Sequence, residues 1–394
     1  MSLSTRELLY ADHHATTPVA PEALEAMAPW QAFSANPSST HAAGRLARQA
    51  VEEARAEVAR AIGGRPEEIV FTSGGTEADN LAVRGAAFAA RKADPRRSVV
   101  LITNAEHPAV REAARALGQD GFEVVELPVD ADGLPVPKAL EARLDDRAAL
   151  LSAILASNET GVVNQEIPRL AAQAREAGVL AHTDAVQAVG KIPVDAAALG
   201  VDFLALTAHK FGGPKGAGAL WVRKGCRLAP LAAGGGQERG RRAGTENVAA
   251  IVGLGMAIRL ATARRESEAA RLALLRDRLE SGLLASIPGL RVNGTSLPGT
   301  VRLPTATSAV FPGVPAEVLV AALDLEGIAV SAGSACASGT TKPSPLLVAM
   351  GLTPEEARRT LRFSFGVTTR PEEIDRLLSV VPRVWARGAR AEAC

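Results

Sequence analysis

The stretch LTAHKFGGPKGAG places Lys210 after an apolar run and before a glycine-rich turn. A lysine at the edge of a sheet loses hydration, which lowers the pKa of its amine and makes it a nucleophile able to form a Schiff base with a carbonyl. The glycines that follow let the chain turn away from whatever the amine reaches. Taken alone, the stretch is explained at least as well by a surface lysine in a polar loop, so its interpretation depends on its neighbours.

Three other stretches contain the residue types that such a lysine needs. Asp184 in HTDAVQAVG ends an apolar run, where a carboxylate could keep a pyridine nitrogen protonated or could simply cap a helix. Gly75 and Thr76 in TSGGTEADN stand at a strand-to-helix turn, where free amides and a hydroxyl can hold a phosphate. His107 in NAEHPAV could stack on a flat ring or move a proton, and a role limited to the helix start explains it equally well.

Together these residues supply a lysine, an acid for a ring nitrogen, a phosphate turn and an aromatic lid. These are the four parts of a pyridoxal 5'-phosphate site. Each follows its own apolar run, and chance explains the whole set less well than it explains any single member. The sequence therefore predicts a pyridoxal 5'-phosphate enzyme.

The stretch VSAGSACASGTTKPSPLL surrounds Cys336 with small residues and has neither a helical nor a strand pattern. A cysteine on such a segment can be exposed and reach a pocket, although from this stretch alone an inert thiol is an equally good interpretation. We interpret Cys226 and Cys394 as incidental. The three cysteines have no CxxC or ligand spacing, so we expect neither a disulfide framework nor a metal site.

The elements that must position these residues follow from alternating apolar runs and Ala/Arg/Glu-rich stretches between Glu67 and Val222. This alternation predicts an α/β fold with a doubly wound, mostly parallel sheet, in which ligands gather beyond the carboxyl ends of the strands. We expect a large cofactor-binding domain over 31–258, a smaller α+β domain over 259–394 that carries the cysteine segment, and residues 1–30 packed with the smaller domain. The polar clusters that follow the runs are Ser73–Asn80, Asn104–His107, Asn158–Thr160, Thr183–Gln187 and Thr207–Lys210.

Composition excludes several classes of function. The 44 basic and 43 acidic residues nearly cancel, and no basic run with interleaved aromatics is present, so we expect no binding to nucleic acid. No apolar stretch reaches the roughly 18 residues of a membrane span, and the start lacks the apolar centre of a signal peptide. We therefore expect a cytoplasmic protein. The stretch IVGLGMAI has a bulky Ile258 where a dinucleotide site needs its third glycine, so we expect it inside a helix.

With these residues assembled, the chain resembles the cysteine desulfurases of the NifS/IscS-like branch, pyridoxal 5'-phosphate enzymes of the class V aminotransferase fold group. The resemblance covers nearly the whole chain and implies fold type I, with a mainly parallel seven-stranded sheet and a smaller α+β domain at the carboxyl end. The motifs that carry it are DHHATTP, NPSSTH, FTSGGTEADN, EHPAV, NETGVV, HTDAVQAVGK, TAHKFGGPKG, GGGQERGRRAGTENV, SAGSAC and LRFSFG.

The resemblance also implies a role for each matched residue. Lys210 would bond to the cofactor and move protons, His107 would stack on the ring and act as acid and base, and Cys336 would take sulfur from L-cysteine as a persulfide, releasing L-alanine. The sulfur would pass to an acceptor protein such as an iron–sulfur scaffold. The residues implied to bind the cofactor are Gly75, Thr76, His107, Asn158, Asp184, Gln187, Thr207, His209, Lys210 and, from the second subunit of a homodimer, Thr245. The residues implied to bind substrate are Asn36, Asn158 and Arg362, the last forking onto the carboxylate.

Other functions share part of this pattern. A selenocysteine lyase would use every cofactor residue without depending on Cys336, and an aminotransferase would have no use for that thiol. A sulfur-carrier platform would need the thiol but no turnover. The sequence does not choose among sulfur acceptors.

Overall fold

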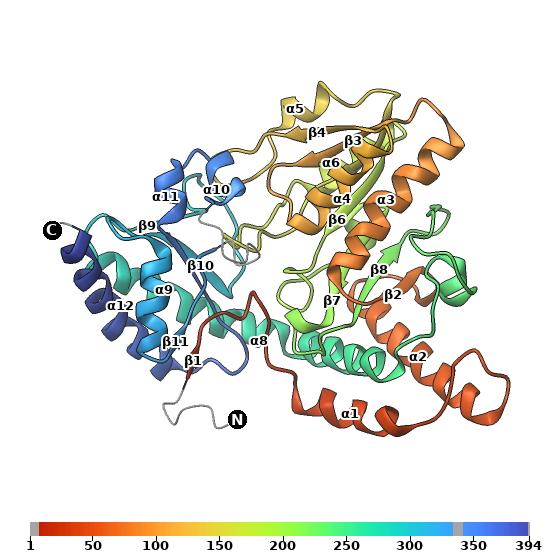
Figure 1. Ribbon diagram of the computed structural model, residues 1–394, viewed down its shortest axis with the longest axis horizontal. Coiled ribbons are helices and arrows are strands. Elements are labelled where there is room, and N and C mark those ends of the chain that lie inside the picture. Colours follow the sequence, from red (N-terminus) through yellow and green to blue (C-terminus); the bar gives the residue numbers. More distant parts are fainter. Residues whose placement is uncertain (1–7, 334–341, 393–394) are drawn as a thin grey trace.

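A seven-stranded sheet forms the centre of the larger part of the molecule, as seen in a computed structural model that describes residues 8–333 and 342–392 (Figure 1). The strand order is β2-β8-β7-β6-β5-β3-β4, and β8 is antiparallel to both of its neighbours, while the remaining pairs are parallel. This confirms the predicted α/β fold with a mainly parallel sheet. The strands are β2 (Ile69–Thr72), β3 (Val99–Thr103), β4 (Glu123–Leu127), β5 (Ala148–Ser152), β6 (Leu180–Asp184), β7 (Phe203–Thr207) and β8 (Gly218–Val222).

The central strands are apolar along their whole length because both faces of the sheet are covered. Alternate residues enter two separate cores: Phe71 and Leu204 pack with α2, α6 and α8, whereas Val70 and Phe203 pack with α3 and α4. The helices are α1 (Pro21–Ala32), α2 (Ala42–Ala61), α3 (Gly75–Ala93), α4 (Pro108–Gln119), α5 (Pro137–Glu141), α6 (Ile167–Glu176), α7 (Ala196–Leu199), α8 (Val248–Ser286), α9 (Ala316–Leu325), α10 (Pro345–Ala349), α11 (Pro354–Arg358) and α12 (Pro371–Glu392), with short 3-10 turns η1 (Pro66–Glu68), η2 (Ala208–Lys210) and η3 (Gln237–Gly240).

Helix α8 contains the glycine pair that could have suggested a dinucleotide site. A Cβ on Gly255 would stand 2.8 Å from the Cα of Ala54, so this glycine lets α8 approach α2 closely. The pair therefore serves helix packing, and the prediction that it lies inside a helix is confirmed.

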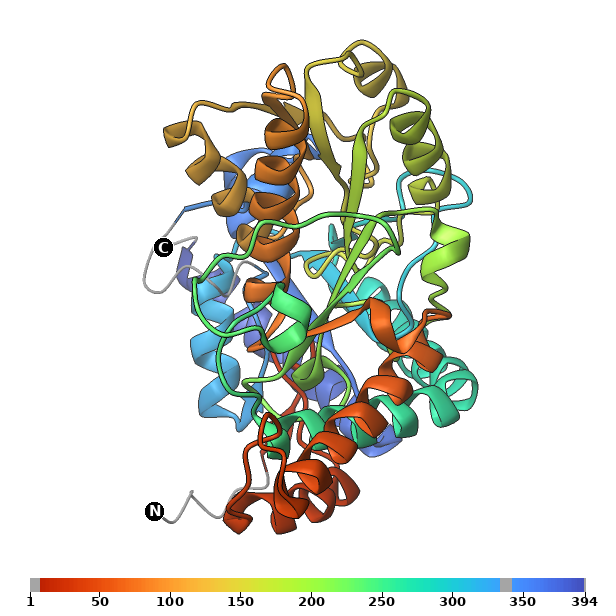
Figure 2. The ribbon, with the colours of Figure 1, turned by 90° about the vertical axis from the view of Figure 1, so that its right-hand side faces the viewer.

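A smaller layer forms around the second half of α8 (Figure 2). Its strands β9 (Arg291–Val292), β10 (Ala306–Val310) and β12 (Thr360–Ser364) form an antiparallel sheet that packs with α9 and α12. From the chain start, β1 (Leu9–Tyr10) pairs in parallel with β11 (Ile328–Ala329), whereas α1 packs on α8, with Met27 against Gly253. The predicted boundary at 258/259 falls inside α8, and the division into domains stays a prediction.

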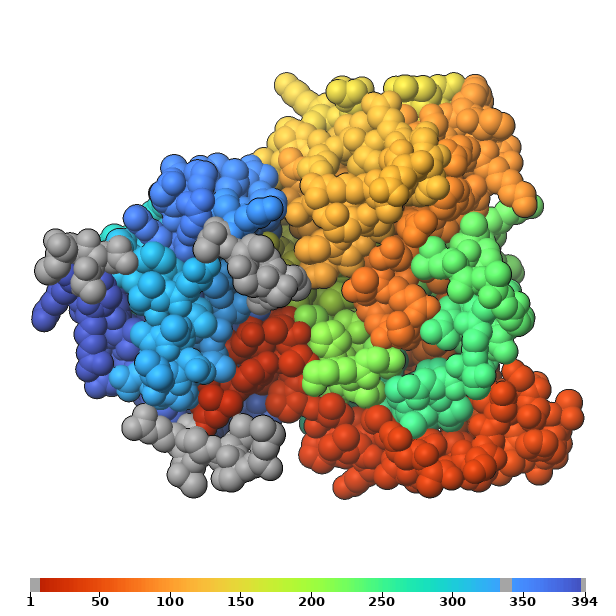
Figure 3. Space-filling model, viewed as in Figure 1, coloured from red at the N-terminus to blue at the C-terminus, as the bar shows by residue number. Residues whose placement is uncertain are grey.

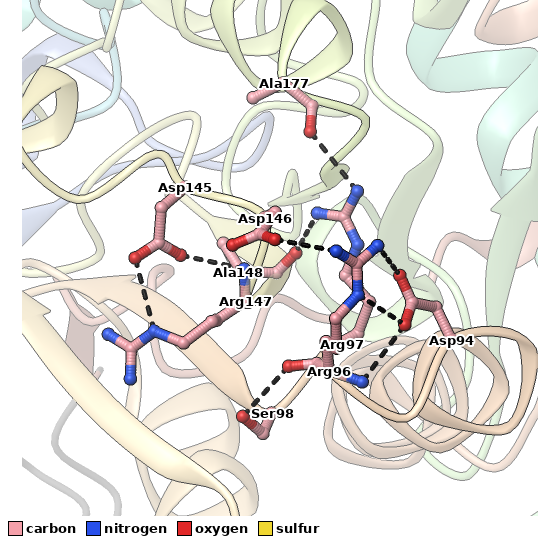
Figure 4. Close-up of polar contacts among 9 residues, drawn as sticks. All are labelled: Asp94, Arg96, Arg97, Ser98, Asp145, Asp146, Arg147, Ala148 and Ala177. Carbon is pink, nitrogen blue, oxygen red and sulfur yellow. Dashed lines mark hydrogen bonds and ion pairs between the residues drawn. The ribbon is translucent and has the colours of Figure 1, made fainter.

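Charged side chains tie together the turns that precede β3 and β5 (Figure 4). Arg96 bonds Asp94 through two nitrogens and reaches Asp146 at 2.9 Å, and Arg97 donates to the carbonyl oxygens of Ala148 at 2.6 Å and Ala177 at 3.4 Å. Exposed ion pairs of this kind contribute little stability each. Their effect is to hold the turns before two neighbouring strands together, at the edge opposite the polar clusters.

Candidate active site

The carboxyl ends of β6 and β7 bring Asp184 and Lys210 to one edge of the sheet. Asp184 is the last residue of β6, and Lys210 ends the η2 turn directly after β7. The Lys210 amine donates to the carbonyl oxygens of His14 and, at 2.8 Å, Ala15. The Gln187 amide donates to the same His14 oxygen at 2.9 Å, so Gln187 and Lys210 share an acceptor. The segment after β1 is therefore one wall of the site, and in Figure 3 it lies in red between the small layer and the residues after β7.

Asp184 is a buried carboxyl group whose surroundings disfavour its ionised form. Burial, with the neighbouring Asp79 adding to it, raises the Asp184 pKa to about 8, while Lys210 acts in the opposite direction. Its Oδ1 accepts the amide of Val186 at 2.8 Å. A cation placed beside this carboxylate would offset the cost of burying it.

His107 lies beside this carboxyl group and also begins a helix. Its Nδ1 accepts the amide N–H of Ala109 at 3.1 Å, as an N-cap does. A ring nitrogen of His107 and carboxyl oxygens of Asp184 and Asp79 lie within 4.8 Å of one another. Burial and the positive charge of Lys210 lower the His107 pKa to about 4. The imidazole is therefore neutral at physiological pH, and the capping and functional interpretations of this histidine are both compatible with the structure.

The turn between β2 and α3 depends on its glycines. A Cβ on Gly75 would stand 2.9 Å from Val186 Cγ2 and 3.7 Å from Thr207, so a larger residue would push these elements apart. Thr207 ends β7 in register with the end of β2, which places its buried side chain beside the turn. Thr76 is exposed on the first turn of α3. His209 follows Thr207 by two residues, and its Nδ1 lies 3.2 Å from the Thr16 hydroxyl.

This set of donors and acceptors fits pyridoxal 5'-phosphate. The amino end of the 19-residue helix α3 suits a phosphate. Val186 and Thr207 lie close to this end only because Gly75 has no side chain. The buried Asp184 suits a protonated ring nitrogen, and Lys210 supplies an amine from the turn that follows the neighbouring strand β7.

Arg362 on β12 is buried beside the site. It donates to the Asp12 carboxylate at 2.7 Å and to the backbone carbonyl of Asn158 at 2.8 Å. Its Nε is buried and has no hydrogen-bond partner within the described ranges. Arg362 and Asn158 therefore lie in contact, and a guanidinium with an unused buried N–H can still donate to a carboxylate.

Two predicted residues lie apart from this cluster, and a third lies outside the described residues. Asn36 is exposed and accepts the amide of Ser38 at 2.8 Å. Thr245 is also exposed and lines a cavity of about 150 Å³ together with Ser73, next to the glycine turn. Cys336 lies outside the described residues, as does Cys394. The thiol of Cys226, 3.5 Å from Asp202, has its pKa raised by burial to about 12, which agrees with an incidental role.

Sequence reasoning missed several residues around the site. The carbonyl of His14 and the carboxylate of Asp12 come from a segment far away in the chain, and Asp79, Glu106 and His182 form a buried layer behind Asp184. A signal for the last three was present, because each is a titratable residue set in or beside an apolar run, and such residues are rarely buried without a partner. Within the parts of the chain that the structure covers, we find no helix with the length and apolar character of a membrane span.

The chain matches known families over nearly its whole length. The family model of class V aminotransferases matches residues 9–377. An IscS-like cysteine desulfurase of Mycobacterium tuberculosis (strain ATCC 25618 / H37Rv) is 44% identical over 387 residues, which cover 98% of both chains.

Two solved structures resemble the fold closely. A NifS-like protein superposes with a TM-score of 0.88 at 34% identity, covering 97% of this chain and 100% of the other. A structure described as SspA in complex with cysteine has a TM-score of 0.78 at 34% identity, with 91% of this chain and 98% of the other covered.

Proposed function

Because the chain belongs to the class V aminotransferases and, within them, to the cysteine desulfurases, we propose that it converts L-cysteine to L-alanine and retains the sulfur as a persulfide. The observation that carries the proposal is the convergence of Lys210, Asp184 and His107 beyond the carboxyl ends of β7, β6 and β3, beside the buried Arg362. The solved relative described as a complex with cysteine supports the choice of substrate.

The proposed cofactor is pyridoxal 5'-phosphate, which when bound withdraws electrons from the bonds at the substrate α-carbon. Asp184 would hold the ring nitrogen, and the amine of Lys210 would carry the cofactor and move protons at the substrate carbon. The residues proposed to complete the site are Gly75, Thr76, Thr207, His209 and the partner subunit's Thr245 at the phosphate, and His107, Asn158 and Gln187 around the ring.

Arg362 would bind the substrate carboxylate, with Asn36 and Asn158 beside the substrate. The fixed bonds to Asp12 and to the Asn158 carbonyl hold the guanidinium still, so little side-chain entropy is lost on binding. The neutral imidazole of His107 can accept a proton from the substrate ammonium or thiol, since burial keeps it unprotonated.

Cys336 would be the nucleophile toward sulfur. Its thiolate attacks the sulfur of L-cysteine, a sulfur–sulfur bond forms, and the bond between that sulfur and the substrate Cβ breaks. The electron pair stays with carbon, which takes a proton to become the methyl group of L-alanine. An acceptor protein, such as an iron–sulfur scaffold, would then remove the outer sulfur.

The test is product formation from L-cysteine by the cofactor-loaded protein, with and without Cys336. We expect L-alanine and sulfide in equal amounts when a thiol reductant is present, and a loss of at least about 100-fold in Cys336→Ala. Cys226→Ala is the matched control and should keep full activity. Full-rate sulfide release by Cys336→Ala would contradict the proposal, and unaffected turnover of selenocysteine alone would indicate a selenocysteine lyase.

A further inference from the structure

A layer of buried polar side chains lies behind Asp184 and takes no part in the proposed reaction. It consists of Asp79 on α3, His182 on β6, Ser152 on β5 and Glu106 just before α4, and all four are buried. Four buried polar groups in one place are costly unless they satisfy one another.

The four side chains lie in one row, in which hydrogen bonds join His182, Ser152 and Glu106, and Asp79 is in close contact with His182. Asp79 Oδ1 lies 3.5 Å from His182 Nε2, and His182 Nδ1 lies 2.9 Å from the Ser152 hydroxyl. That hydroxyl donates to Glu106 Oε2 at 3.4 Å. Since an imidazole and a hydroxyl each pass a hydrogen bond onward, a proton on Asp79 would complete the row of hydrogen bonds from Asp79 through His182 and Ser152 to Glu106.

The two ends of the row differ in how well they support a negative charge. Glu106 accepts the Thr103 hydroxyl at 2.6 Å and the Ile154 amide at 2.8 Å. Asp79 Oδ1 and His182 Nε2 have no hydrogen-bond partner within the described residues. Hydrogen-bond donors favour the ionised form of a carboxyl group, so the charge is better placed on Glu106.

The surroundings of Asp79 also disfavour a negative charge on its carboxyl group. An oxygen of Asp79 lies within 4.8 Å of Asp184, which faces it from β6, and burial together with Glu106 raises the Asp79 pKa well above its usual value. The pKa of Glu106 rises only to about 7, and that of His182 falls to about 4. The other charged or titratable groups around this layer are His107, Lys210 after β7 and Arg111, which donates to the Glu106 carbonyl.

We propose that Asp79 is a protonated, neutral positioning residue, and that the negative charge of the Asp79–His182–Ser152–Glu106 row resides on Glu106. A neutral Asp79 lets Asp184 carry a single negative charge without a second one beside it. The benefit to a bound pyridoxal ring rests on the proposed function, whereas the location of the proton does not.

The test is infrared spectroscopy of the cofactor-loaded protein at a pH above the Glu106 pKa of about 7, so that Glu106 is mostly ionised; the method detects the carbonyl stretch of protonated carboxyl groups and its shift in heavy water. We expect one such band to be lost in Asp79→Asn and kept in the matched variant Glu106→Gln. Thr183→Ser, on the same strand as His182, controls for disturbance of β6. A band lost in Glu106→Gln and kept in Asp79→Asn, or no band at all, would overturn the proposal.

Two further measurements keep the test decisive if a variant fails to fold. Carbon-13 labelling of aspartate alone, in the unaltered protein, should shift the band, and labelling of glutamate alone should not. A pH titration of the cofactor's visible absorption gives its proton affinity. In Asp79→Asn we expect this affinity to change by less than about twofold, because one neutral group replaces another. A change above about tenfold would show that Asp79 is ionised. None of these measurements depends on turnover. The proposal about Asp79 can therefore be refuted while desulfurase activity is present, and it can be supported when that activity is absent.

Discussion

At the scale of single residues, Asp184 lowers the stability of the protein until it has a cationic partner. Its folded pKa of about 8 is above that of an unfolded aspartate, so its contribution is favourable at low pH and is lost as pH rises through about 4 to 8. We therefore expect cofactor-free Asp184→Asn to be more stable than the unaltered protein at pH 9, by roughly 2 kcal/mol or more, with a smaller difference at pH 5. Unfolding by urea at both pH values measures this. A difference that grows toward low pH would refute the assignment.

Arg362 should act mainly through substrate binding. A lysine cannot reproduce the planar fork that contacts Asp12, Asn158 and a substrate carboxylate together. We expect Arg362→Lys to raise KM for L-cysteine by about 10-fold or more, corresponding to at least about 1.4 kcal/mol, with a smaller effect on kcat. Steady-state kinetics measure both constants. Arg291→Lys, at an exposed ion pair on β9 of the same sheet, is the control and should leave KM unchanged.

At the scale of elements, close helix packing explains why glycines stand within α8. A Cβ on Gly255 would press on the backbone of Ala54, whereas one on Gly118 of α4 would meet nothing within 4 Å. We expect Gly255→Ala to destabilise the protein by about 1–3 kcal/mol and Gly118→Ala to stabilise it by about 0.5–1 kcal/mol. Thermal unfolding of the two variants measures this. Equal effects would mean that α2 and α8 do not approach as described.

The elements could be predicted from the sequence because their signals are local. Continuous apolar runs mark strands buried on both faces, and the polar residues after β6 and β7 indicated where Asp184 and Lys210 would meet. The wall made by His14 could not be predicted in this way. It reaches Lys210 across 196 positions from a segment that follows β1, and two-residue strands such as β1 and β11 leave no periodic pattern.

The buried layer behind the site was missed for a related reason. Asp79, Glu106 and His182 lie in or beside apolar runs, where a single residue looks like a cap or a surface position. Their meeting depends on the spatial order of β6, β5 and β3, which local patterns do not determine. The same limit applies to Asp12, whose bond to Arg362 spans 350 positions.

At the scale of the whole molecule, the exposed Thr245 tests the proposed homodimer. If Thr245 serves the partner's site, mixing Lys210→Ala with Thr245→Ala subunits creates hybrids with one intact site, because both defects fall in the other. We expect the mixture to recover up to about a quarter of the unaltered activity after subunit exchange. Activity that stays at the average of the two separate variants would place Thr245 in its own subunit's site.

The account rests on a cofactor bonded to Lys210 at the carboxyl edge of the large sheet. The most direct measurement is borohydride reduction of the protein loaded with pyridoxal 5'-phosphate, followed by digestion and mass spectrometry of the labelled peptide. The account predicts a single reduced pyridoxyl group, on Lys210, and none after Lys210→Ala. Label on the half-buried Lys191, whose charge interacts with that of Lys210, or a protein that takes up no cofactor, would contradict it.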